Sequence, residues 1–209
     1  MEHFIDSEKR MDKVFKESLD LFKGRSLSFL DQELSDKVED ILSTEITQTT
    51  TKKSYADYAL KLSGNKGLHS EWQAEVRMND IMRFCTYNID LARKHNIPFT
   101  TIIVTIKKPS VSVYESPSLR FSPIVVNLRE RGAEEAIKRI NDKLKKGQTI
   151  NELELVYLPL YTSKTGKTMA ELTGLALELT TKVSQDTTEQ DKLKALCAPR
   201  ARYPSSIAA

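Results

Sequence analysis

Alternating polar and apolar residues between Tyr55 and Gln73 predict two short β-strands joined by a tight turn. Every second residue is apolar from Tyr55 to Leu62, and a similar alternation returns from Leu68 to Gln73. A period of two is typical of a strand that buries one face. The intervening residues 63–67 read Ser-Gly-Asn-Lys-Gly, and their glycines can take the positive φ that a hairpin loop needs. The pattern therefore predicts a half-buried β-hairpin.

The same kind of pattern predicts the other elements of the chain. Helices are expected over 7–23, 31–43, 79–95, 133–146 and 168–183, and further strands over 99–106, 111–114, 119–128 and 152–161. Residues 45–53 form either a first strand or a flexible approach to the hairpin. The strand–helix–strand order around 79–95 implies a parallel pair with a right-handed crossover. These elements predict a mixed α/β fold with a central mixed sheet flanked by helices, in one domain over 1–183 followed by a polar, mobile tail over 184–209.

The hairpin also suggests chemistry, because its register decides which polar residues meet. Placing Leu62 across from Leu68 keeps the apolar faces together. It makes Asp57 and Glu71 diagonal neighbours on the two strands, with roughly 7 Å between their backbones. Two carboxylates at that separation can share one hard divalent cation, which prefers oxygen ligands. The alternative interpretation is a solvated polar face with no ligand, which is common in antiparallel sheets.

The acidic residues belong to a longer motif that resembles a known family. The motif consists of Asp57, the segment Leu68-His69-Ser70-Glu71-Trp72-Gln73, then Arg83 with Tyr87, and an opening segment Asp12-Lys13-Val14-Phe15-Lys16-Glu17. This combination is similar to the Rpn family of recombination-promoting nucleases and transposases, which belongs to the PD-(D/E)XK nuclease superfamily. The resemblance covers roughly residues 7 to 180. It implies a restriction-endonuclease-like core and a Mg²⁺-dependent DNA endonuclease, with Mn²⁺ as a possible substitute.

The resemblance also implies roles for individual residues. Asp57, Glu71 and the backbone carbonyl of Trp72 would hold the metal, and Gln73 would orient the attacking water or a ligand. Gln73 stands where the best-known sites of the superfamily have lysine, and a neutral amide cannot supply the lysine charge. Lys61, on the same face of the hairpin, and Lys53 are the two candidates for that charge. The resemblance further implies DNA contacts by Arg83, Tyr87 and Lys53, and a third acidic ligand from among Glu17, Glu39 and Glu45.

Composition sets limits on these interpretations. The chain has 209 residues, of which 39% are hydrophobic and 29% charged, values typical of a folded globular domain. It has no apolar run long enough to span a bilayer and no secretory signal at its N-terminus. Its two cysteines, Cys85 and Cys197, predict reduced thiols in a cytoplasmic protein. The net charge of +3 is weak for a DNA-binding protein, although a local basic rim such as the outer face of the 133–146 helix would suffice.

Three functions follow from the sequence. The first is a metal-dependent DNA endonuclease linked to recombination or transposition, and the second is a non-catalytic DNA-binding or protein-interaction module on a nuclease fold. The third is a toxin-like or defence nuclease held inactive by a partner. DNA is the expected partner, no membrane is expected, and a homodimer formed through the 168–183 helix would allow both strands to be cut.

Overall fold

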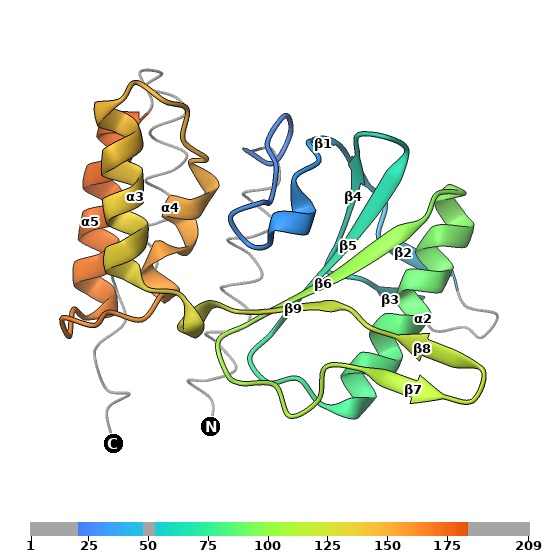
Figure 1. Cartoon of the computed structure of the whole chain (residues 1–209). Helices are drawn as coiled ribbons and strands as arrows, with labels where there is room; N and C mark the ends of the chain where they lie inside the picture. Colours follow the sequence, from blue (N-terminus) through green and yellow to red (C-terminus); the bar gives the residue numbers. More distant parts are fainter. Residues whose placement is uncertain (1–20, 48–52, 184–209) are drawn as a thin grey trace. The chain divides into compact units, whose positions relative to one another are not determined.

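The computed structural model describes residues 21–47 and 53–183 (Figure 1). Its contacts divide the chain into two compact units, one up to Asn127 and one from Leu128 onward. Most of the helix predicted over 7–23, and the tail predicted over 184–209, lie outside the described residues. Because dense contacts alone do not make a unit fold independently, the single domain over 1–183 stays a prediction.

Five strands of the first unit form one sheet in the order β1–β4–β5–β6–β9. They are β1 (Val38–Leu42), β4 (Tyr58–Leu62), β5 (Lys66–Gln73), β6 (Phe99–Thr105) and β9 (Ile124–Asn127). β1, β4 and β5 pair antiparallel, whereas β5, β6 and β9 pair parallel. Helix α2 (Met78–His95) joins β5 to β6 and supplies the crossover that a parallel pair needs. The predicted fold class, mixed α/β with a central mixed sheet flanked by helices, is confirmed.

The β4–β5 hairpin pairs two residues away from the predicted register. Leu62 lies opposite Lys66 rather than Leu68, and the turn is tighter than predicted, with Gly64 and Asn65 at φ values of 75° and 57°. A shift by an even number of residues leaves every side chain on its predicted face. It does change the neighbours, because the observed register continues to a position where Asp57 faces Glu71 directly instead of diagonally.

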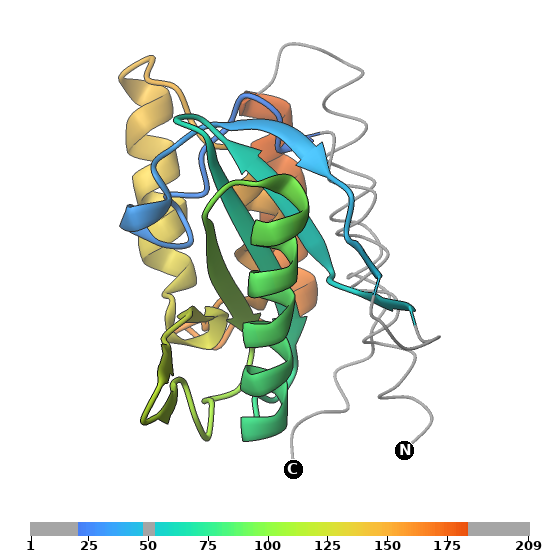
Figure 2. The same cartoon turned by 90° about the vertical axis from the view of Figure 1, so that its right-hand side faces the viewer.

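Both faces of β5 are buried, which corrects the prediction of a half-buried strand. Leu68 and Ser70 lie on one face, His69 and Glu71 on the other, and none of the four is more than 9% exposed. β5 is the central strand of the sheet. Figure 2 shows α2 lying across one face of this sheet, and rings of α2 contact His69 on that face. The polar side of the hairpin is thus an interior surface beneath a helix, as is common for strands with a parallel neighbour.

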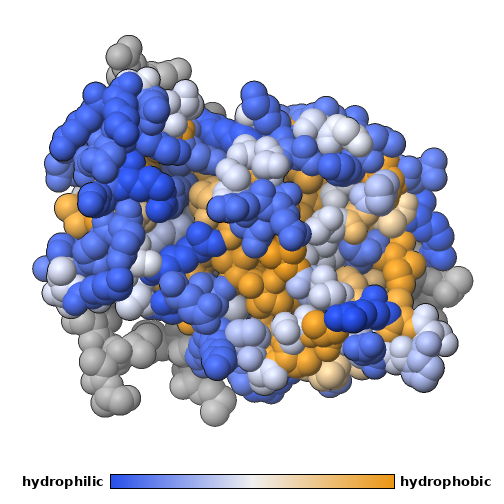
Figure 3. Space-filling view, in the orientation of Figure 1, coloured by the Kyte–Doolittle hydropathy of each residue, from blue (hydrophilic) through white to orange (hydrophobic). Residues whose placement is uncertain are grey.

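The buried face of α2 agrees only in part with the apolar stripe that helical spacing predicts, which consists of Met78, Ile81, Met82, Cys85, Ile89 and Ala92. Ile81 and Cys85 are buried as predicted, whereas Met78, Met82 and Ile89 are 44%, 46% and 51% exposed. The buried residues of α2 are Ile81, Phe84, Cys85, Tyr87 and Leu91. Figure 3 shows hydrophobic side chains reaching the surface among hydrophilic ones on one face of the molecule. The helix has apolar residues on two stripes, and the stripe with the aromatic rings packs on the sheet because those rings bury the most area.

The segment before the hairpin differs most from its prediction. Residues 31–43 were predicted as a helix, but they form a 3-10 turn, η2 (Gln32–Leu34), followed by strand β1. A register shift between Val38 and Asp40 interrupts the strand alternation. Such a bulge mimics helical spacing in the sequence, which explains the error. The segment around 45–53 contributes a small antiparallel pair, β2 (Glu45–Thr47) with β3 (Lys53–Tyr55), and a second pair joins β7 (Tyr114–Ser116) to β8 (Leu119–Phe121).

The second unit consists of helices. Its elements are η3 (Leu128–Glu130), α3 (Ala133–Lys145), α4 (Leu153–Tyr157), η4 (Leu158–Leu160) and α5 (Met169–Val183). The strand predicted over 152–161 is wrong: residues 153–161 are all buried, and a short, fully buried helix shows no period that separates it from a strand. The capping box of α5 is confirmed, since Thr168 Oγ1 accepts from the Glu171 N–H and Glu171 Oε2 accepts from the Thr168 N–H. Among the described helices, none is both long enough and apolar enough to cross a bilayer.

One carboxyl group of the second unit is buried. Glu154 of α4 has a side chain 7% exposed and pairs with Arg139 of α3. Burial raises the pKa of Glu154 because it disfavours the charged form, and the opposing attraction of Arg139 is smaller. Ionised Glu154 is therefore a source of instability that protonation removes.

We expect the substitution Glu154→Gln to become more stabilising, relative to wild type, as pH rises. In the unfolded chain Glu154 titrates near about pH 4.3, and its folded-state pKa is higher. The stability it contributes is complete below the unfolded pKa and is lost as pH rises through the folded pKa. Glutamine stays neutral and still offers Arg139 an acceptor. Urea unfolding followed by circular dichroism, at several pH values between about 4 and 8, measures the difference between the two proteins. A difference that is constant, or that moves against the variant with rising pH, would contradict the expectation.

Candidate functional site

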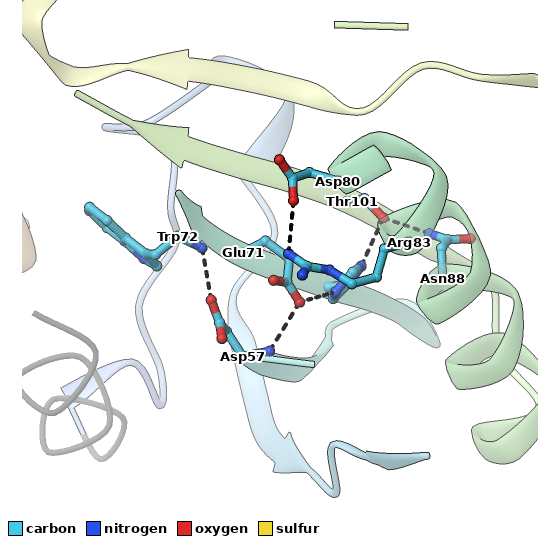
Figure 4. Close-up of polar contacts among 8 residues, drawn as sticks. Asp57, Glu71, Trp72, Asp80, Arg83, Asn88 and Thr101 are labelled. Carbon is cyan, nitrogen blue, oxygen red and sulfur yellow. Dashed lines mark hydrogen bonds and ion pairs between the residues drawn. The ribbon is translucent and has the colours of Figure 1, made fainter. Parts of the chain in front are cut away.

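The candidate site forms where the β4–β5 ladder ends. The last pair of the ladder is Tyr58 with Ser70, so β5 continues for three residues without a partner on β4. The Trp72 N–H, which the ladder no longer satisfies, donates to Asp57 Oδ2 at 2.9 Å. In return, the Asp57 N–H donates to Glu71 Oε1 at 3.0 Å. Each carboxylate thus accepts a backbone N–H of the residue pair beyond the end of the ladder, which ties Asp57 to the Glu71–Trp72 segment (Figure 4).

Glu71 is a buried acid. Glu71 is 3% exposed. Its Oε1 lies 2.8 Å from His69 Nε2 and also accepts a hydrogen bond from the Asp57 N–H. Within the described part of the chain, Oε2 of Glu71 makes no hydrogen bond. Burying a carboxylate is costly unless it is paired or hydrogen-bonded. Two donors on one oxygen hold this carboxylate in place and leave its other oxygen for a ligand.

His69 connects the acid to the interior of the unit. The residue is 0% exposed, and its Nδ1 lies 3.1 Å from Thr101 Oγ1 on the neighbouring strand β6. Asn88 of α2 donates to the same Thr101 oxygen at 2.9 Å. The rings of Phe84 and Tyr87 stand edge-on to the imidazole, with centroids 6.2 and 6.1 Å away. Buried, hydrogen-bonded polar side chains thus connect the site on β5 through β6 to α2.

The residues present fit a hard divalent cation of the Mg²⁺ type. Asp57 and Glu71 provide carboxylate oxygens beside backbone carbonyls, and oxygen donors are those that Mg²⁺ prefers. The described residues contain no group of three His, Cys, Asp or Glu side chains that could enclose a metal. Mg²⁺ does not need such a cage, because it usually keeps several waters and binds through one or two carboxylates. Both ring nitrogens of His69 already have hydrogen-bond partners. A metal at this site would therefore be bound by the carboxylates and not by the imidazole.

The structure does not bring Lys61 to this site. Lys61 lies opposite Gly67, four residues before Glu71 on β5, which corresponds to roughly 13 Å along the strand. Its ammonium pairs instead with Glu39 Oε2 at 3.2 Å. Sharing a face was correctly predicted, but the position along the strand excludes Lys61 from contact with the acids. Gln73, by contrast, is two residues beyond Glu71 on the same face and is partly exposed, as the predicted role requires.

The two predicted DNA contacts on α2 differ in their surroundings. Arg83 has a side chain 44% exposed, pairs with Asp80 at 3.3 Å and lies 4.9 Å from the centre of the Phe84 ring. At that exposure its guanidinium can reach a phosphate at the surface, and its described partners are Asp80 and Phe84 rather than the two site carboxylates. The ring of Tyr87 is buried against His69, so the structure does not support its predicted contact with DNA. The side chain of Lys53 lies outside the described residues.

The candidates for a third acidic ligand lie in different parts of the chain. Glu39 lies on β1 near the Lys61 end of the hairpin, and Glu17 lies outside the described residues. Glu45 begins β2, and its backbone carbonyl accepts from Lys94 at 2.5 Å.

Three polar residues of the site were missed as functional from the sequence. His69 was placed on the correct face but given no role, and Thr101 and Asn88 were treated as parts of a strand and a helix. A signal for Thr101 was present, because a threonine in an otherwise apolar central strand needs a buried hydrogen-bond partner. Its partner could not be identified without the pairing of β5 with β6, which sets His69 opposite Thr101.

Comparison of the chain with protein-family models, with curated proteins and with solved structures finds no significant match. The resemblance to the Rpn family therefore rests on the motif residues themselves, of which Asp57, Glu71 and Gln73 gather at one end of the β4–β5 hairpin.

Proposed function

We propose that this protein is a metal-dependent DNA endonuclease, linked to recombination or transposition, in which Asp57 and Glu71 hold Mg²⁺ or Mn²⁺. The observation that supports it is that a buried carboxylate, Glu71, is hydrogen-bonded to the backbone of a second acid, Asp57, at the end of two paired strands. Bringing two acids together and burying one of them is costly, since like charges repel and buried charges lose their hydration, and a bound cation would offset that cost. A restriction-endonuclease-like core, DNA as partner and a cytoplasmic location belong to the same proposal.

Each residue of the proposed site has a definite task. Asp57 and Glu71 bind the metal, which when present lowers the pKa of a bound water and neutralises charge on the attacked phosphate. Gln73 orients that water through its amide, and the carbonyl of Trp72 is a further ligand. Arg83, exposed on the first turns of α2, holds a phosphate through its planar guanidinium. Without Lys61, no lysine of the described residues is assigned to the site, so charge neutralisation rests on the metal and Arg83.

A plasmid-nicking assay tests the proposal. We expect supercoiled plasmid to be nicked or linearised by the wild-type protein with Mg²⁺ or Mn²⁺, and to stay intact with a chelator. Calorimetric titration with Mn²⁺ gives an independent measure of the site. Folded protein that neither cuts DNA nor binds Mn²⁺ would remove the proposed function.

A second function is favoured by a specific observation. Asp57 and Glu71 both accept hydrogen bonds from backbone amides, so they can be explained as caps of the β4–β5 ladder in a non-catalytic DNA-binding or protein-interaction module. In that case Mn²⁺ would not bind, and any affinity for DNA would be unchanged by Asp57→Ala. The two functions therefore differ in a measurement that does not depend on finding the correct DNA substrate.

A further inference from the structure

A continuous chain of hydrogen bonds leads from α2 to the buried acid of the proposed site. Asn88 contacts Thr101, Thr101 contacts His69, and His69 contacts Glu71, at 2.9, 3.1 and 2.8 Å. The central members are closed to solvent, with Thr101 3% and His69 0% exposed (Figure 4). A buried chain of this kind has to satisfy every donor, because an unpaired one is costly.

Which group donates and which accepts in each of these hydrogen bonds follows from the orientation of the Asn88 amide. Asn88 Nδ2 lies 2.9 Å from the backbone carbonyl of Phe99, which can only accept, so this atom is the amide nitrogen and not the oxygen. The same nitrogen therefore donates to Thr101 Oγ1. The Thr101 hydroxyl proton then has one described acceptor, His69 Nδ1. If Nδ1 carried a proton instead, that buried hydroxyl proton would have no acceptor in the described structure.

The tautomer of His69 follows from this direction. With Nδ1 accepting from Thr101, the ring proton of neutral His69 lies on Nε2 and points at Glu71 Oε1. Oε1 thus receives two hydrogen bonds, one from the backbone amide of Asp57, which directly precedes β4, and one from the imidazole. The carboxylate is fixed in rotation, with Oε2 as the oxygen that remains for a ligand.

We propose that His69 is a positioning residue that fixes the Glu71 carboxylate for metal binding, through a tautomer set by Thr101. The inference rests on the proposed function, since it assumes that Glu71 is a metal ligand. Metal ligands are commonly oriented by partners one layer further out, and loss of such a partner lowers affinity about 10- to 100-fold. Here the ligand is the carboxylate and the histidine is its support. The edge-on rings of Phe84 and Tyr87 hold the imidazole in the plane that this task needs.

The first test reads the tautomer in the metal-free protein. Long-range ¹H–¹⁵N correlation spectra distinguish the Nε2–H form from the Nδ1–H form, and the chain has three histidines, so His69→Asn suffices to assign the signal. We expect the spectrum of the Nε2–H form for His69, and Thr101→Val to reduce that preference. A proton found on Nδ1 alone would overturn the inference, because His69 could then not donate to Glu71.

The second test uses two amides that differ only in reach. Glutamine places its side-chain nitrogen at the ε position, where it can replace His69 Nε2, whereas asparagine places it at the δ position, near Thr101. Both remove a ring from the same buried place and leave an uncharged amide; because asparagine is one methylene smaller, the thermal stability of both variants is measured alongside binding. We expect His69→Asn to weaken Mn²⁺ binding about 10- to 100-fold, measured by calorimetry or by the free Mn²⁺ signal in electron paramagnetic resonance, and His69→Gln to recover most of the loss.

The outcomes separate this inference from the function it rests on. Wild-type protein that binds Mn²⁺, with both variants weakened equally or not at all, would overturn the role of His69 and leave the metal site standing. Wild-type protein that binds no Mn²⁺ would overturn both. Rescue by glutamine but not by asparagine, at equal thermal stability of the two variants, would support the positioning role, because a purely structural histidine would show no such difference.

Discussion

The substitution Glu71→Gln should abolish metal-dependent nicking, with a loss on the order of a thousandfold or more. The loss corresponds to several kcal/mol of transition-state stabilisation that a bound metal supplies. Glutamine keeps an oxygen that can accept from the Asp57 N–H and from His69, so the ends of β4 and β5 should stay in place. What it removes is the negative charge on which Mg²⁺ binding depends. The measurement is the initial rate of plasmid nicking under saturating Mg²⁺, with circular dichroism to confirm the fold.

Glu39→Gln is the matched control for this prediction. It makes the same chemical change on strand β1, where the carboxylate is 46% exposed and pairs with Lys61 rather than with the site. We expect it to retain full activity. Cleavage by Glu71→Gln at the wild-type rate would exclude Glu71 as a metal ligand, while equal losses in both variants would point to net charge instead of the site.

Much of the fold could be predicted because its strongest patterns are local. The hydrophobic run of β6 and the amphipathic periods of α3 and α5 each contain enough residues to identify the element type. The errors fall where the pattern is short or interrupted. A bulge between Val38 and Asp40 gave β1 the spacing of a helix, and burial on all sides removed the period of α4. Neither interruption is visible without the neighbouring elements that cause it.

The candidate site was predictable in part for the same reason. Asp57 and Glu71 were expected together because the parity of a hairpin survives an error of two residues in register. Lys61 was misassigned because parity fixes the face of a strand and not the distance along it. His69, Thr101 and Asn88 come from three elements whose contacts depend on the β5–β6 pairing and on which stripe of α2 faces the sheet. The strand pairing and the buried face of α2 are determined by packing between distant segments, and the local sequence pattern does not contain this information.

The stripe of α2 that faces the sheet leads to the second large effect. Phe84→Ala should destabilise the first unit by about 3–5 kcal/mol, the usual loss when a buried phenylalanine is truncated. Phe84 is 0% exposed, packs among Ile81, Leu91 and Ile103, and forms one wall of the His69 pocket. Trp72 is the only tryptophan of the chain and lies in this unit, so its fluorescence follows the unfolding by urea. The midpoint should fall by roughly 2 M, given ordinary denaturant slopes.

Met82→Ala provides the control for this change, because it lies two residues away on the same helix but is 46% exposed. We expect its free energy of unfolding to stay within about 0.5 kcal/mol of wild type. Equal losses for the two variants would mean that α2 packs through the stripe of Met78 and Met82. The packing of Phe84 against His69 described above would then be contradicted. A large loss for Phe84 alone would show that packing of the aromatic stripe holds α2 over Glu71. In that case the same variant should also weaken Mn²⁺ binding, because the imidazole that supports the carboxylate would lose one of the rings that keep it in place.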